Sequence, residues 1–110
     1  MVEPIAAAGG LTAEIVIEQE REPFETSAEH PPVLATRRAA ECVMGFSPRV
    51  IGRRIVGDAN IYVNGASIPC YYFGPMNDTL HSDCEWVSIK QGTECAQIYL
   101  GTALGFCGIA

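Results

Sequence analysis

Residues 60–68 carry the feature that most constrains the fold, because Asn64 and Gly65 stand there between two short β-prone runs. An Asn-Gly pair tolerates positive φ at both positions, which is what the type I′ turn of a two-residue hairpin requires. The chain also contains 11 glycines and 7 prolines, a number that favours many turns over long helices. The sequence therefore predicts a β-hairpin that turns at Asn64 and Gly65.

Several further segments have the composition of strands. Residues 11–18 alternate apolar and polar side chains, which is typical of a half-buried strand. Gly52 interrupts a β-branched run and suggests a bulge, while Lys90-Gln91-Gly92 suggests the turn of a second hairpin. The uncharged tail, residues 101–110, is expected to pack as a last strand or against the core. The predicted strands are residues 11–18, 49–56, 60–63, 66–73, 85–89 and 94–100.

One segment favours a helix. Residues 33–44 are rich in good helix formers, and their apolar residues recur near helical spacing. Gly45 follows where a helix often ends with positive φ, and Thr36 is an alternative N-cap. Residues 19–32 are polar and contain three prolines, so they are expected to form a loop.

The predicted fold is mainly β: a small antiparallel β-barrel or sandwich with one short helix and an extended N-terminal arm. Residues 1–10 form the arm, and residues 11–110 form a single β-rich domain. No apolar run reaches the roughly 18 residues of a membrane-spanning helix. The first residues lack the basic start of a signal peptide. We therefore expect a location in the cytoplasm or in a virion.

The five cysteines cannot all pair within one chain, so we expect mostly reduced, buried thiols. The two-residue spacing between His81 and Cys84 could present two metal ligands from one loop, and Cys95 and Cys107 could complete a tetrahedral set. The spacing of the last two is wide, however, and they are better explained as core residues. We predict no bound metal, no cofactor and no catalytic residue.

Charge is unevenly distributed in the sequence. The net charge is −6, which disfavours general nucleic-acid binding. Six glutamates lie between residues 14 and 29, and five of the seven basic residues follow between residues 37 and 54. This segregation suggests either two solvated faces or a docking surface for a partner. The candidate interaction residues are Arg37, Arg38, Arg49, Arg53, Arg54, Tyr71, Tyr72 and Trp86.

By elimination, the leading functional hypothesis is a non-enzymatic structural or interaction subunit of a larger assembly, such as a virion capsid or decoration component. Its partners would be proteins, most simply other copies of the same chain, and it would not contact a membrane. One alternative is a small β-barrel that binds nucleic acid through the basic region Arg37–Arg54 and stacks bases on tyrosines. A further alternative is a small Cys-dependent enzyme or a zinc-binding domain.

Overall fold

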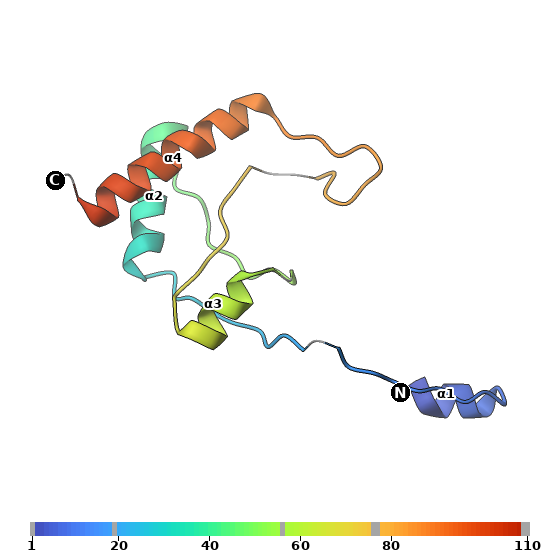
Figure 1. Ribbon diagram of the computed structural model, residues 1–110. Helices are drawn as coiled ribbons and strands as arrows, with labels where there is room; N and C mark the ends of the chain where they lie inside the picture. The colour runs from blue at the N-terminus through green and yellow to red at the C-terminus, as the bar shows by residue number, and fades with distance from the viewer. Residues whose placement is uncertain (1, 19, 56, 76–77, 109–110) are drawn as a thin grey trace.

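Helices and extended connections make up the fold (Figure 1). The computed structural model describes residues 2–18, 20–55, 57–75 and 78–108. These residues contain no β-strand, so the prediction of a mainly β barrel or sandwich is wrong. The four helices are α1 (Val2–Ala8), α2 (Pro31–Met44), α3 (Ala59–Ala66) and α4 (Ile89–Cys107).

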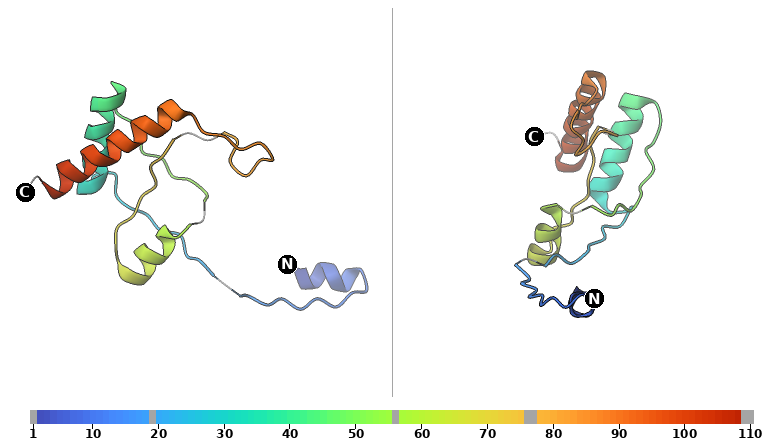
Figure 2. Two further views of the ribbon diagram at one scale, coloured as in Figure 1. Left: turned by 45° about the horizontal axis from the view of Figure 1, so that its top comes forward. Right: turned by 90° about the vertical axis from the view of Figure 1, so that its right-hand side faces the viewer.

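The packed centre of the molecule is the pair α2 and α4, which is the one helix pair in contact within the described part of the chain (Figures 1 and 2). Val33 and Ala40 of α2 and Cys95 and Ile98 of α4 are buried there. Ile98 is the largest side chain that is fully buried. Ala59 of α3 is also buried, so the apolar core of the described residues is small and lies mainly at this one helix crossing.

The helix predicted at residues 33–44 is confirmed, and α2 begins two residues earlier. Pro31 and Pro32 occupy its first turn, where a missing N–H costs no hydrogen bond. Gly45 ends the helix with φ 79°, as the sequence predicts, and its N–H donates to the Glu41 carbonyl. His30 is the N-cap, so the alternative N-cap Thr36 is wrong; Thr36 is buried inside the helix.

The Asn64-Gly65 hairpin is also wrong, because residues 59–66 form α3. Asn60 and Asn64 are four residues apart and lie on one helix face. Both side-chain amides donate to the Glu22 carbonyl, at 2.7 and 2.9 Å. These contacts with a distant segment favour the helix over the local turn preference. The left-handed residue comes later, at Ser67, with φ 54°.

The second hairpin is replaced by α4, whose 19 residues include both predicted turn and strand positions. Ser88 caps the helix by accepting a hydrogen bond from the Gln91 N–H. Cys95, Ile98 and Thr102 follow at helical spacing and face α2, which explains why an apparent β pattern folds as a helix. The tail, expected to pack as a last strand or against the core, is helical as far as Cys107. Its last two residues, 109–110, lie outside the described residues.

Three predicted strands are extended but unpaired. Residues 11–18, 50–55 and 67–73 have no ladder partner within the described residues; residue 56 of the second segment is not described. Residues 20–30 are irregular, which agrees with the predicted loop. The N-terminal arm was expected to be extended, whereas residues 2–8 form α1, a helix with no buried residue.

The molecule is long for its size. Its principal extents are 65 × 35 × 22 Å and its radius of gyration is 19.6 Å, whereas a compact chain of this length would have a radius of gyration of about 13 Å. Figure 2 shows α1 at the end of an extended segment, away from α2 and α4. Among the described helices, none combines the length and the apolar character needed to cross a bilayer.

Candidate functional site

A closed loop at residues 79–86 precedes α4. Thr79 Oγ1 accepts a hydrogen bond from the Trp86 N–H at 3.0 Å and donates to the Trp86 carbonyl at 3.3 Å. Inside the loop, the Thr79 carbonyl accepts from both the N–H and the hydroxyl of Ser82, at 3.0 and 2.7 Å. These bonds join the two ends of an exposed excursion and fix its shape.

His81 lies at the tip of this loop in an unusual conformation. Its φ is 63°, in the left-handed region that costs a non-glycine residue free energy. The Glu85 carboxylate accepts the His81 N–H at 3.3 Å and helps to hold that backbone. The His81 side chain is exposed to solvent. A strained residue held by its surroundings, with a titratable side chain facing outward, marks a functional-site candidate.

The weak metal candidates of the sequence do not come together. Cys95 is buried in the α2–α4 contact, whereas Cys84 and Cys107 are exposed. Within the described residues, no three His, Cys, Asp or Glu side chains are placed to share a metal ion. The expectation of buried thiols holds for Cys95 alone: Cys42 is exposed as well, Cys70 is half-buried, and all five are free.

Two titratable groups of α4, the buried Cys95 and the partly exposed Tyr99, have shifted pKa values. Burial raises the pKa of the Cys95 thiol, and the neighbouring Glu94 carboxylate adds to the shift. Burial also raises the pKa of the Tyr99 phenol, with further contributions from Cys95 and Tyr71. Both groups therefore stay protonated at neutral pH, and neither is activated as a nucleophile.

A chain of hydroxyl groups ties the helix pair to residues 70–73. Thr36 and Tyr71 share a hydrogen bond of 2.6 Å, and Tyr71 also donates to the Pro32 carbonyl at 3.1 Å. Thr102 of α4 reaches the Thr36 hydroxyl at 3.1 Å. Tyr99 donates to the Phe73 carbonyl at 2.6 Å. These partners position the extended segment and give Tyr71 a structural role.

The structure distributes the candidate interaction residues over separate elements. Arg37 is half-buried on α2, and its Nε has no hydrogen-bond partner. Arg49, Arg53 and Arg54 are exposed on the extended segment that follows. Tyr72 packs against Phe24, with ring centroids 6.2 Å apart. Trp86, the last residue of the closed loop, is 64 % exposed, so it is not a core residue.

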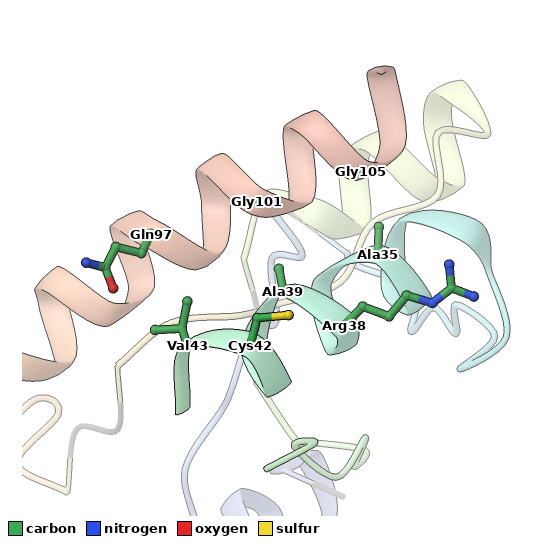
Figure 3. A pocket seen from close by; sticks show the side chains of 8 residues that line it. All are labelled: Ala35, Arg38, Ala39, Cys42, Val43, Gln97, Gly101 and Gly105. Carbon is green, nitrogen blue, oxygen red and sulfur yellow. The ribbon is translucent and has the colours of Figure 1, made fainter. Parts of the chain in front are cut away.

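A shallow groove runs along the α2–α4 contact (Figure 3). Small residues line most of it, and Arg38 lies at one end with Gln97 at the other. Gly101 lies so close to α2 that a Cβ built on it would be 3.0 Å from the Ala39 Cβ. The groove therefore results from close helix packing, and its lining offers no nucleophile–base pair.

The sequence pattern groups His81 with three cysteines as possible metal ligands and does not single out His81 on its own. The left-handed backbone of a histidine leaves no mark in composition or spacing. The signal that could have found it is the density of hydrogen-bonding residues between Thr79 and Glu85, which predicts a structured loop rather than a loose one.

The protein family of the chain is identified by comparison with known proteins. No curated protein and no solved structure matches the chain, but residues 4–105 match the family model described as Peptidase family M20/M25/M40. This match overturns the expectation of a non-enzymatic capsid or assembly subunit and also the expectation that the protein is not an enzyme. Since the match covers almost the whole sequence, the chain belongs to peptidase family M20/M25/M40.

Proposed function

We propose that this chain contributes to a peptidase active site, and that His81 is its residue in contact with the reacting groups. The family assignment supports the reaction class, hydrolysis of an amide bond. The assignment of His81 rests on its left-handed backbone, in a loop closed by hydrogen bonds between Thr79 and Trp86.

Amide hydrolysis requires a water molecule to lose a proton as it attacks the carbonyl carbon. Imidazole accepts such a proton well, because its ordinary pKa lies close to neutral pH. It is also a common ligand for the metal ions that activate water. The exposed imidazole of His81 is open to substrate, whereas His30, the other histidine, is half-buried at the start of α2.

The local structure explains why this position suits a reacting side chain. The Glu85 carboxylate and the Thr79–Trp86 bonds hold the backbone on both sides of His81. A side chain on a fixed backbone loses less conformational freedom when substrate binds, which lowers the barrier to reaction.

The test uses the purified protein and a mixture of short peptides, with new termini detected by mass spectrometry. We expect hydrolysis by the wild-type protein and a loss of at least about a hundredfold for His81→Gln, the usual scale for removing a general acid–base group. His30→Gln is the matched control and should retain activity.

A chelator then separates the two roles of the imidazole. Loss of activity on chelation and recovery with added Zn²⁺, together with weaker Zn²⁺ binding by His81→Gln than by the wild-type protein, would assign His81 to a metal. Activity that the chelator leaves unchanged would assign it to proton transfer. Full activity of the His81→Gln variant would contradict the proposal.

A further inference from the structure

A second pocket, separate from the loop that carries His81, lies where α2, α4 and the extended residues 69–73 meet. Its volume is about 420 Å³, which is within the size range of small-molecule sites. Among the described residues that line it, none is charged. Most of the lining consists of four aromatic rings and two threonine side chains: Tyr71, Phe73, Tyr99, Phe106, Thr36 and Thr102.

The hydroxyl groups of Thr36, Tyr71 and Thr102 make more hydrogen-bond contacts than they have protons. Each hydroxyl carries one proton, whereas the three groups take part in four contacts. A carbonyl oxygen can only accept, so the contact with the Pro32 carbonyl takes the Tyr71 proton. The contact with the Ile98 carbonyl takes the Thr102 proton in the same way. Only the Thr36 proton is left for the two contacts between hydroxyl groups.

The distances decide which of these two contacts has no proton. The hydroxyl oxygens of Thr36 and Tyr71 are 2.6 Å apart, whereas those of Thr36 and Thr102 are 3.1 Å apart, which is longer than a usual O–H···O bond. The Thr36 proton therefore lies toward Tyr71, and the Thr36 and Thr102 oxygens meet without a proton between them. Because Thr36 is only 4 % exposed, an acceptor left there without a donor is costly.

The other polar side chains of the pocket also direct their protons at the protein. The Tyr99 hydroxyl donates to the Phe73 carbonyl at 2.6 Å. The Cys70 thiol, which also lines the pocket, donates to the Ile68 carbonyl at 3.4 Å. Among the lining side chains that the structure describes, every hydroxyl and thiol proton thus has a protein acceptor. A ligand that enters the pocket meets lone pairs and has to supply the donors itself.

The aromatic rings favour a donor that carries a positive charge. Phe73 and Tyr99 pack edge to face, with ring centroids 6.0 Å apart. The face of an aromatic ring attracts a cation through its quadrupole, and the net charge of −6 adds a general attraction. An ammonium group combines several N–H donors with a positive charge, so it matches both the lone pairs and the rings.

We propose that this pocket binds a small primary ammonium compound, whose ammonium group donates to the oxygens of Thr36 and Thr102 and whose apolar body lies among the aromatic rings. The inference is independent of the proposed peptidase site, because no residue of the loop at residues 79–86 lines this pocket.

The probe is 2-phenylethylammonium, added to the full chain at pH 7. Binding is followed by the amide chemical shifts of residues 99–106 in a nuclear magnetic resonance titration. We expect a dissociation constant of about 1 mM or lower, which is within reach of a ligand of this size. The matched control probe, 3-phenylpropionate, has a similar apolar body but a carboxylate that only accepts, and it should bind at least about tenfold more weakly.

Substitutions in α4 test the contacts. Thr102→Val keeps the branched shape, removes one of the two oxygens and should weaken binding of 2-phenylethylammonium about tenfold or more. Thr93→Val is the matched control, because the Thr93 hydroxyl donates to the Ile89 carbonyl one turn earlier and lies outside the pocket; it should bind the probe as the wild-type protein does. Phe106→Leu, at a position 55 % exposed, removes one ring and should weaken binding about threefold.

Three results would overturn the proposal. The first is the absence of amide shifts in residues 99–106 at 2-phenylethylammonium concentrations up to about 10 mM. The second is equal affinity for 3-phenylpropionate or for the neutral donor 2-phenylethanol, because either would show that the ammonium group is not selected. The third is a Thr102→Val variant that binds the probe as tightly as Thr93→Val does.

Discussion

Replacing Gly101 by alanine tests whether α2 and α4 pack as closely as the structure shows. Gly101 lies in the middle of α4, facing α2. A Cβ at this position would be 3.0 Å from the Ala39 Cβ and 3.8 Å from the Ala39 Cα. Because the Ala39 side chain has no rotamer to change, the helices themselves must separate to admit the new methyl group.

The expected magnitude follows from two opposing effects. Alanine in place of glycine stabilises a helix interior by about 1 kcal/mol. Forcing an extra methyl group into a close contact costs about 1–3 kcal/mol. Gly101→Ala should therefore leave stability unchanged or lower the free energy of unfolding by up to about 2 kcal/mol.

Gly105, four residues later in the same helix, is the matched control. A Cβ built on it meets no atom within 4 Å, so Gly105→Ala should raise the free energy of unfolding by about 1 kcal/mol. Urea denaturation followed by circular dichroism at 222 nm measures both variants. Equal stabilisation by the two substitutions would refute the close contact, and the double variant Gly101→Ala with Ala39→Gly should recover the loss if the contact is real.

The remaining predictions concern the core. Ile98→Ala should lower the free energy of unfolding by about 2–5 kcal/mol because Ile98 is fully buried. Leu100→Ala, at a position 62 % exposed, should change it by less than about 0.5 kcal/mol, and similar losses for both variants in urea denaturation would contradict this core. Burial and Glu94 raise the pKa of Cys95, so its thiolate is scarce below that pKa and increases as pH rises. Iodoacetamide should therefore modify Cys95 more slowly than the exposed Cys84 at pH 8, and equal rates by mass spectrometry would argue against its burial.

The sequence predicted α2 because its local signals agree with one another. Helix formers, apolar spacing and a terminal glycine at position 45 all favour the same element, and tertiary contacts only add to it. The loop at residues 20–30 was predictable for a similar reason, since prolines and acidic residues oppose both helices and sheets there.

The remaining elements depend on contacts between segments far apart in the sequence. Asn64-Gly65 is a strong turn signal on its own, but the Glu22 carbonyl binds Asn60 and Asn64 together and favours a helix. Residues 94–100 read equally well as a short strand or as one face of a helix, and packing of Ile98 against α2 decides between them. His81 was visible only as a possible ligand, because its backbone conformation is set by Glu85 and by the Thr79–Trp86 bonds.

Chemical rescue of a His81→Gly variant tests the central claim most directly. Glycine accepts the left-handed backbone at this position without strain, so the loop should keep its shape while the imidazole is lost. We predict that peptide hydrolysis falls by at least about a hundredfold and recovers progressively as free imidazole is added to the assay. Undiminished hydrolysis by the variant, or a loss that imidazole leaves unchanged while circular dichroism shows an intact fold, would contradict a reacting role for the His81 side chain.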